Sequence, residues 1–456
     1  MKPPLNRLEQ TLFAVAVSIA CLASAFEAYG TLTAMPVAAE QFGSIESYAW
    51  TMTSMISAQL VAIVVAGRIS DKIGSIRPLA VGVVLFVIGL FTAGLAPTMA
   101  TLILARVLQG LGSGTMNLTV MVAIASAYKG KARADMMGLL SFCWLLPAFV
   151  GPPIAAWITE TFSWHWVFLG VIGFVLPAIA LGLKPAVKLD SPPKTNTLTS
   201  PIPISFALLA TLGVCSLQLA GTKEIGEAIG SLSALIGVGG FVVLMIALPK
   251  LMPAGFRRLK PGLPSIVATR ILTCGALFAS ENFLVLLLTI RYEMSLTHAG
   301  ILLSIGSLGW TVGAFAQGRD WISLRKDQLI KLGTVLMVIS TAGIAFSAWA
   351  GFGLWVISGC YVVSGLGAGL MSSVSSVLNM QLSEEGELGR NTSSIQLADT
   401  IGNAVFTGMA GTIFAALHLI SPPAVVFAAI YASLCVVSVL AACVSSRIGK
   451  IETIGG

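Results

Sequence analysis

Three carboxylic acids and one arginine inside long apolar runs of this sequence are candidates to carry chemistry: Glu27, Glu281, Asp399 and Arg106. A low-dielectric site disfavours the charged form of a carboxyl group, so such an acid can load and release a proton across the working pH range. An arginine inside a membrane helix costs about 2.5–3.5 kcal/mol on insertion scales and therefore marks a wet or paired site. These residue types predict proton coupling or substrate contact, and structural hydrogen bonding between neighbouring helices is the alternative.

Apolar helices are the elements that would position these side chains. The 456 residues are 56% hydrophobic and 10% charged, whereas soluble domains carry about 25% charged residues. Uncharged runs of about twenty apolar residues are candidates for membrane spans. The sequence therefore predicts an all-α polytopic membrane protein with about fourteen spans, at residues 11–35, 48–67, 78–97, 100–127, 134–158, 165–184, 202–221, 228–248, 265–290, 298–317, 328–349, 353–379, 391–417 and 423–445.

The basic residues predict the orientation of these spans. The net charge of +7 comes from lysines and arginines in alternate loops, and such residues accumulate on the cytoplasmic side of a membrane. The distribution indicates an even number of spans with both termini in the cytoplasm, and it argues against a nucleic-acid partner. The seven cysteines stand singly in apolar runs, so we expect neither disulfides nor a metal site.

A short polar stretch, Gly67–Leu79, links the second and third spans. It contains one acid, three basic residues and two glycines, namely Asp71, Arg68, Lys72, Arg77, Gly67 and Gly74. Glycines permit a close helix approach and a tight turn. The pattern resembles the loop between helices 2 and 3 of the major facilitator superfamily. The resemblance implies that Asp71 and its neighbours latch the cytoplasmic side in one conformation, whereas an ordinary basic loop is the plainer interpretation.

Two further motifs carry the same resemblance. In the fourth span, Arg106, Gln109 and Gly110 belong to a motif similar to one that the superfamily associates with proton coupling. In the fifth span, Pro147, Gly151 and Pro152 resemble the motif of exporters that exchange substrate for protons. The following Ala155 and Ala156 depart from it, since glycines are common there. The plainer interpretations are an interfacial arginine and a packing kink, because proline removes a backbone donor.

Together the motifs and the span count resemble the fourteen-span drug:proton antiporter branch of this superfamily. The resemblance implies the major facilitator fold, with six-helix bundles at residues 1–184 and 263–456. Residues 185–262 would hold a cytoplasmic linker and two inserted transmembrane helices. The implied function is secondary active export of small amphipathic compounds in exchange for protons, by alternating access. The sequence contains no phosphate-binding loop and no metal-ligand motif, so we expect neither an enzyme nor a cofactor.

Residues close to the buried acids are candidates to line a substrate cavity, because aromatic rings bind amphipathic and cationic ligands. They are Phe26, Tyr29, Phe142, Trp144, Phe278, Asn282, Phe283 and Trp310. We expect a monomeric, multi-pass protein of the plasma membrane. Its partners would be protons, the lipid bilayer and a small amphipathic substrate, which could be cationic.

Three other functions remain open at this point. Uptake by proton symport is one, although the motif of the fifth span argues against it. Export of an endogenous metabolite, lipid or peptide is the second, because an apolar cavity leaves no sharp motif for its substrate. The third is a non-transporting scaffold or receptor, which would have no need for acids in the middle of its spans.

Overall fold

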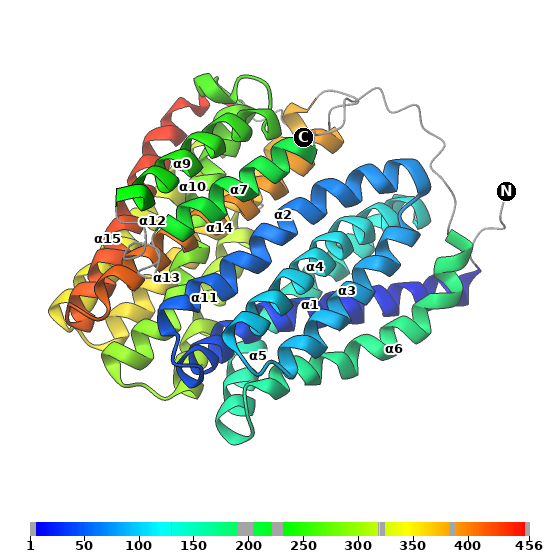
Figure 1. Cartoon of the computed structure of the whole chain (residues 1–456). Helices are drawn as coiled ribbons and strands as arrows, with labels where there is room; N and C mark the ends of the chain where they lie inside the picture. The colour runs from blue at the N-terminus through cyan, green and yellow to red at the C-terminus, as the bar shows by residue number, and fades with distance from the viewer. Residues whose placement is uncertain are drawn as a thin grey trace. The chain divides into compact units, whose positions relative to one another are not determined.

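A computed structural model describes residues 6–128, 130–189, 204–220, 231–317, 319, 324–383 and 388–451. All regular secondary structure in these residues is helical (Figure 1). Up to residue 189 the helices are α1 (Arg7–Gln41), α2 (Tyr48–Ile73), α3 (Ile76–Gly94), α4 (Met99–Ala127), α5 (Gly130–Thr161) and α6 (His165–Leu189). The later helices are α7 (Ile204–Ala220), α9 (Ser231–Leu251), α10 (Leu263–Leu286), α11 (Leu296–Ala316), α12 (Lys326–Ala350), α13 (Leu354–Leu382), α14 (Leu388–Leu417) and α15 (Pro423–Ser445).

Each of the fourteen predicted spans coincides with one of these helices. Within the described residues, twelve helices are long and apolar enough to cross a membrane. Helices α7 and α9 contain shorter apolar segments, Ile204–Ala220 and Leu235–Leu251, so the count of fourteen spans stays a prediction. The all-helical fold class of a membrane protein is confirmed, whereas the side on which the termini lie is not tested.

The polar stretch at Gly67–Leu79 is less of a loop than predicted. Helix α2 continues to Ile73 and α3 begins at Ile76, so only two residues connect them. Gly74 has a φ of 87°, a value that glycine adopts without the steric cost that a Cβ would bring. The prediction placed the helix end too early, because charged residues continue a helix readily once it has passed the apolar run. The glycine turn itself is confirmed.

The chain divides into two compact units. Unit 1 consists of Met1–Ile45, Ser57–Asn196 and Leu296–Ser304, and unit 2 of Glu46–Ile56, Thr197–Ser295 and Ile305–Gly456. Unit 1 therefore includes the short C-terminal segment Leu296–Ser304, and unit 2 includes the short N-terminal segment Glu46–Ile56. The predicted division at residues 184/185 and 262/263 stays a prediction, and residues 190–203 of the predicted linker region lie outside the described part of the chain.

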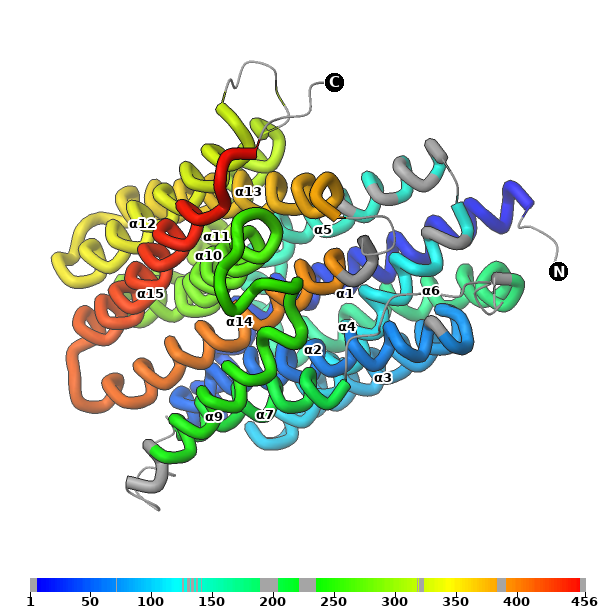
Figure 2. The backbone as a smooth tube through the Cα atoms, turned by 90° about the horizontal axis from the view of Figure 1, so that it is seen from above, coloured from blue at the N-terminus to red at the C-terminus, as the bar shows by residue number. Residues whose placement is uncertain are grey.

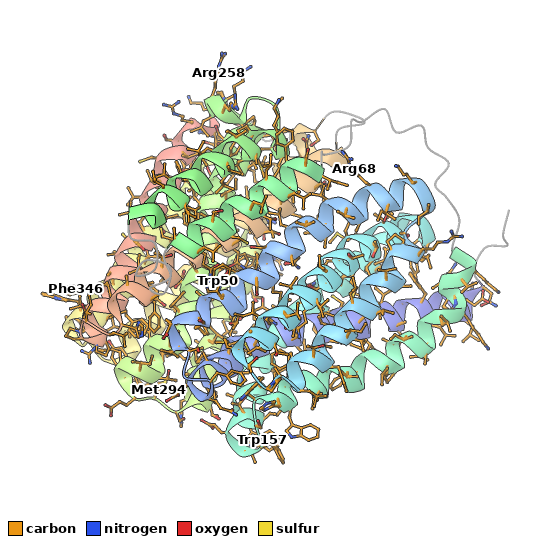
Figure 3. The ribbon with its side chains drawn as sticks, in the orientation of Figure 1. Trp50, Arg68, Trp157, Arg258, Met294 and Phe346 are labelled. Atoms are coloured by element: carbon orange, nitrogen blue, oxygen red, sulfur yellow. The ribbon has the colours of Figure 1, made fainter. Side chains whose placement is uncertain are left out.

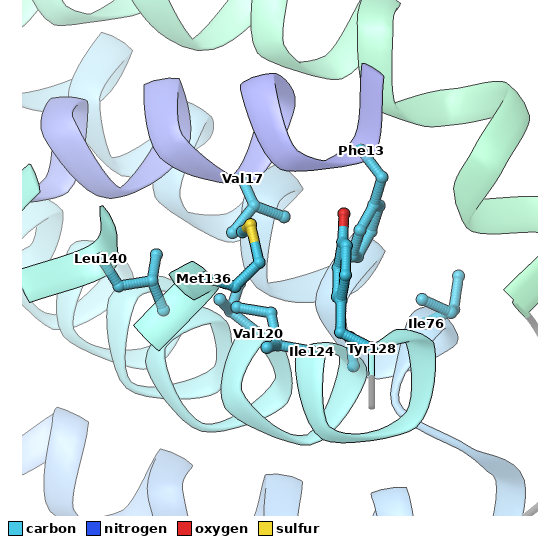
Figure 4. Packing of buried hydrophobic residues seen from close by; sticks show 9 residues of the cluster. Phe13, Val17, Ile76, Val120, Ile124, Tyr128, Met136 and Leu140 are labelled. Atoms are coloured by element: carbon cyan, nitrogen blue, oxygen red, sulfur yellow. The ribbon is translucent and has the colours of Figure 1, made fainter. Parts of the chain in front are cut away.

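One hydrophobic cluster of unit 1 lies where α1 meets α4 and α5. Figure 4 shows Phe13 and Val17 of α1 facing Tyr128, at the end of α4, and Met136 of α5. The rings of Phe13 and Tyr128 stack with centroids 6.5 Å apart. The Tyr128 hydroxyl donates to the Gln10 carbonyl at 2.7 Å, so this buried ring satisfies its polar atom within the unit.

Small residues set the helix packing in unit 2. Helices α7 and α9 lie side by side (Figures 1 and 2), and a Cβ on Gly213 would come within 2.8 Å of the Gly240 carbonyl oxygen. A Cβ on Gly309 would lie 2.1 Å from the Val362 carbonyl oxygen, so α11 and α13 also approach closely. In a bilayer, helices associate by van der Waals contact, and glycine permits the closest contact. Helices α10 and α14 approach each other in the same way, because a Cβ on Gly402 of α14 would lie 2.2 Å from the Ile271 carbonyl oxygen of α10.

Candidate functional site

A buried ion pair joins α1 to α4 in unit 1. The Nη1 atom of Arg106 donates to Oε1 of Glu27. The Glu27 side chain is 0% exposed and the Arg106 side chain 3%. Attraction between opposite charges is strong in such a medium, but it has to offset a large desolvation cost. The structure thus brings together two of the four residues that the sequence predicted for proton coupling.

The hydrogen bonds around this pair are incomplete. Arg106 Nη1 also donates to Oε1 of Gln109 at 2.8 Å. The second carboxylate oxygen of Glu27 and the side-chain nitrogen of Gln109 are buried and have no hydrogen-bond partner among the described residues. A buried polar atom without a partner is costly. The site therefore keeps one acceptor ready for a proton or for a ligand that donates a hydrogen bond.

Glycines position Arg106 and Gln109 by bringing α4 against its neighbours. A Cβ on Gly89 of α3 would lie 2.7 Å from the Gln109 backbone nitrogen, and one on Gly112 would lie 2.4 Å from the Phe86 backbone nitrogen. Both contacts are shorter than real Cβ atoms allow, so these positions require glycine. The predicted motif residue Gly110 is buried in the same helix.

The predicted exporter motif on α5 packs against the predicted cavity residues on α1. A Cβ on Gly151 would lie 3.5 Å from Tyr29 Cβ and 3.7 Å from a ring carbon of Phe26. Pro147 and Pro152 are buried, and α5 remains helical through both. Ala155, which departs from the family motif, lies opposite Gly30 of α1. These contacts place Phe26 and Tyr29 within a turn of Glu27, beside the proline segment.

Two other aromatic residues of α5 lie apart from this contact. Trp144 is 36% exposed and Phe142 is 54% exposed. Exposure of this kind suits a residue that faces a cavity and equally a residue that faces lipid. The predicted role of Trp144 in a substrate cavity therefore stays a prediction.

A second buried ion pair lies in unit 2, between α10 and α14. Arg270 donates from Nε to Oδ1 of Asp399 at 2.7 Å and from Nη2 to Oδ2 at 2.8 Å. Its Nη1 atom donates to the Ser372 carbonyl, the Ser375 hydroxyl and the Ser376 hydroxyl of α13, at 2.7, 2.7 and 3.0 Å. The bidentate geometry is the strong form of an arginine–carboxylate contact. Arg270 thus ties three helices together.

Arg270 was missed by the sequence analysis. A signal for a second arginine was present in the sequence. A charge in a low-dielectric medium needs a partner, and the three candidate acids had only one candidate arginine among them. Arg270 lies within the run that forms α10, and its side chain is 8% exposed. Asp399, with a side chain that is 29% exposed, is therefore part of a fully formed ion pair.

Glu281 of α10 is the third predicted acid, and among the described residues it forms no ion pair. Its Oε1 atom accepts a hydrogen bond from the Tyr361 hydroxyl at 3.0 Å. The Tyr361 ring lies so close to α11 that a Cβ on Gly306 would come within 2.0 Å of it. Glu281 is thus held by a neutral donor, which can remain in place whether or not the carboxyl carries a proton.

The predicted cavity residues of unit 2 have different surroundings. Asn282 donates from Nδ2 to the Thr407 hydroxyl at 2.7 Å, and its backbone carbonyl accepts from the Tyr48 hydroxyl. Phe283 is buried against the Tyr48 and Phe414 rings. Phe278 and Trp310 pack partly buried against apolar clusters. Packing of this kind favours a structural role for Phe283, whereas the roles of the other residues stay predictions.

The predicted latch residues lie at one end of unit 1. Gly67 approaches α4, since a Cβ there would lie 3.3 Å from the Leu118 side chain. Lys72 and Arg77 are exposed, and Arg68 lies near them at the end of α2 (Figure 3). The side chain of Asp71 lies outside the described part of the structure.

The sequence is similar to those of known membrane transporters. The family model described as Major Facilitator Superfamily matches residues 17–407. The multidrug transporter protein MdtP of Bacillus subtilis (strain 168) is 29% identical over 251 residues, which cover 52% of this chain and 44% of that protein. The multidrug efflux pump SdrM of Staphylococcus aureus (strain N315) is 27% identical over 175 residues, or 38% of this chain and 39% of that protein. The chain covers less than half the length of these curated relatives.

Solved structures resemble the whole chain in fold. A POT family transporter in complex with 5-aminolevulinic acid aligns with a TM-score of 0.72 and 16% sequence identity, over 97% of both chains. A peptide transporter POT in complex with sulfate aligns with a TM-score of 0.70 and 17% identity, over 96% of this chain and 94% of that one. At such low identity the likeness concerns the fold alone.

Proposed function

The chain belongs to the Major Facilitator Superfamily, and from this premise we propose that it exports small amphipathic compounds in exchange for protons. It is a membrane transporter, and its relatives include proteins named for multidrug transport. We propose further that it belongs to the fourteen-span drug:proton antiporter branch and acts in the plasma membrane as a monomer. The substrate would be amphipathic, and a cation is the form that a proton-releasing site accepts most readily.

One observation carries this proposal, namely the unpartnered carboxylate oxygen of Glu27. Arg106 holds the other oxygen of the same carboxyl group, so the acid is buried and its Oε2 atom is available to accept a proton. Protonation would cancel the negative charge and remove most of the attraction that holds Arg106. An ion pair that a single proton can break is a suitable device for coupling.

The proposed cycle uses this switch once per exchange. A proton that enters from one side neutralises Glu27 and frees Arg106 to rearrange with Gln109, which biases the two units toward one conformation. Substrate binding beside Phe26 and Tyr29 would favour the other conformation and return the proton. Glu281 is the second proposed proton site, since its Tyr361 partner tolerates both protonation states. The residues Gly67, Asp71, Lys72, Gly74 and Arg77 would stabilise one of the two conformations.

The test is transport of ethidium into proteoliposomes under an imposed pH gradient. Ethidium is permanently cationic, so it cannot follow the gradient by losing a proton. Antiport predicts that ethidium accumulates when the lumen is acidic. For an electroneutral exchange of one ethidium for one proton, a gradient of about 2 pH units limits the ratio of inner to outer ethidium concentration to about a hundredfold. Glu27→Gln should abolish the driven component, because the side chain can no longer release a proton. Glu40→Gln is the matched control, since Glu40 is an exposed acid on the same helix.

The direction of the gradient separates the remaining functions. A symporter would accumulate substrate only when the lumen is alkaline, so that outcome would overturn the proposal of antiport. Driven accumulation by Glu27→Gln equal to that of the wild type would remove Glu27 from the coupling path. Lack of movement by the wild-type protein under both gradients, with a folded protein, would reject amphipathic cations as the substrate class.

A further inference from the structure

A compact basic surface in unit 2 has no role in the proposed transport cycle. It comprises Lys250 at the end of α9, Arg257, Arg258 and Lys260 in the loop before α10, and Arg447 after α15. All five side chains are exposed. Among the described residues, none of the five side chains forms an ion pair, a side-chain hydrogen bond or a cation–π contact. A surface with five exposed basic side chains attracts an anionic partner.

The loop that carries three of these residues has a fixed conformation. It contains the 3₁₀ turn Phe256–Arg258, which is flanked by Gly255 with φ 92° and Leu259 with φ 46°. The Ser265 hydroxyl lies 2.9 Å from the Leu259 carbonyl oxygen and 2.8 Å from that of Lys260. A further hydrogen bond, from Gly262 N to the Ile448 carbonyl at 2.9 Å, fastens the loop to the segment after α15. The charges are therefore preorganised, which lowers the cost of binding a ligand.

Two adjoining cavities open within the basic surface. One, of about 330 Å³, is lined by Lys250, Arg257, Arg258 and Lys260 together with three further residues of the α9 end and the loop. The other, of about 430 Å³, is lined by Arg257, Arg258, Leu259, Cys443, Val444 and Arg447. Arg257 and Arg258 belong to both cavities, and Figure 3 shows Arg258 at the outer tip of its loop. Each volume is sufficient for a phosphate group with its ester substituents.

Apolar stripes continue from both cavities along the helices. On α15, Val436 and Leu440 are 60% and 50% exposed, and they share a helix face with Cys443 and Arg447. On α9, Val242 and Ile246 are 49% and 50% exposed, and they precede Lys250 at intervals of four residues. Residues four apart lie on the same face of a helix. A cationic cavity that ends an exposed apolar stripe matches a molecule with an anionic head and an apolar chain.

We propose that this surface binds the headgroup of an anionic phospholipid, with the acyl chains lying along α15 and α9. Basic pockets between transmembrane helices on the cytoplasmic side are suited to lipid phosphates. The arginines would provide the charge and bidentate donors for the phosphodiester, and the stripes would distinguish a lipid from free phosphate. The proposal does not depend on the proposed proton antiport.

The test is binding of phosphatidylglycerol to the delipidated full-length protein, measured by native mass spectrometry with phosphatidylcholine as the neutral competitor. Each basic residue near an anionic membrane surface is worth roughly fivefold in binding, so Arg258→Gln with Arg447→Gln should weaken phosphatidylglycerol binding by about twenty-five-fold. Arg7→Gln with Lys184→Gln removes two exposed charges from unit 1 as a control. The control should stay within about twofold of the wild type.

Four outcomes would overturn the proposal. The first is an equal loss of binding in the control variant, which would indicate unspecific charge attraction. The second is unchanged binding in the Arg258/Arg447 variant, and the third is no preference for phosphatidylglycerol over phosphatidylcholine. The fourth is full displacement of the lipid by millimolar inorganic phosphate. Thermal unfolding of both variants establishes that they are folded. If the glutamine variant does not fold, Arg258→Lys with Arg447→Lys replaces it, and partial weakening is the expected result because lysine keeps the charge but not the bidentate geometry.

Discussion

The two ion pairs between helices of this protein differ in how completely their polar atoms are hydrogen-bonded. Glu27–Arg106 in unit 1 is almost completely withdrawn from solvent, yet one of its carboxylate oxygens has no hydrogen-bond partner among the described residues. Arg270–Asp399 in unit 2 is more exposed at its acid, but it is bidentate and is extended by three bonds to α13. The first pair joins α1 to α4, and the second joins α10 to α14.

This difference separates a pair that can change state from a pair that holds helices together. A buried carboxylate with a free oxygen can take up a proton there, because neutralisation removes the cost of keeping a charge out of water. A bidentate pair with additional donors loses several contacts at once if its acid is neutralised. We therefore favour Glu27 over Asp399 as the proton-coupling acid, although the sequence predicted both.

The largest expected effect comes from removing one member of each pair. Arg106→Ala leaves the Glu27 carboxylate buried without compensation, which should cost about 3–5 kcal/mol of stability. Addition of Glu27→Gln should restore most of that loss. For Arg270→Ala, the second change Asp399→Asn should restore less, because the Asp399 side chain is less buried than that of Glu27. The measurement is the free energy of unfolding in mixed micelles, as two double-mutant cycles. Equal recovery in both units would contradict the distinction.

A medium effect is expected when Arg270 is replaced by another cation. Arg270→Lys keeps the charge but cannot reproduce the bidentate contact with Asp399 together with the bonds to α13. Loss of charged hydrogen bonds should lower the free energy of unfolding by about 2 kcal/mol. The matched control is Arg7→Lys, at an exposed position outside both ion pairs, which should stay within about 0.5 kcal/mol. If Arg270→Lys kept the free energy of unfolding of the wild type, charge alone would be sufficient to maintain this pair.

The smallest effect concerns a single extension of the pair in unit 2. Ser376→Ala removes the hydroxyl that accepts from Arg270 at 3.0 Å, which should cost about 1 kcal/mol. Ser358→Ala on the same helix is the control, because the Ser358 hydroxyl bonds only to the Leu354 carbonyl within its own helix among the contacts described. Thermal unfolding in detergent should therefore give a lower midpoint for Ser376→Ala than for Ser358→Ala. Identical midpoints would show that the α13 contacts add nothing to the ion pair.

The sequence was sufficient to predict the helices but not their partners. Long apolar runs and the charges between them reveal where spans begin and end, because the bilayer forces backbone hydrogen bonds to close within each segment. The contact between Arg270 and Asp399 joins residues 129 positions apart, and no local pattern encodes it. Arg106 was found because a family motif surrounds it, whereas Arg270 has no such motif. The number of hydrogen bonds to the Glu27 carboxyl group depends on side-chain rotamers and on neighbouring helices, which the spacing of residues in the sequence does not determine.

Residues 46–56 belong to unit 2 although they are made long before the rest of it. Tyr48 donates its hydroxyl hydrogen to the carbonyl of Asn282, which follows it by 234 positions. At about 5–20 residues per second of synthesis, the tyrosine is complete roughly 12–47 seconds before its acceptor exists. During insertion from the ribosome, the start of α2 therefore remains without its final neighbours and depends on the translocon or surrounding lipid. Fragments cut between the halves should assemble only when both are made together.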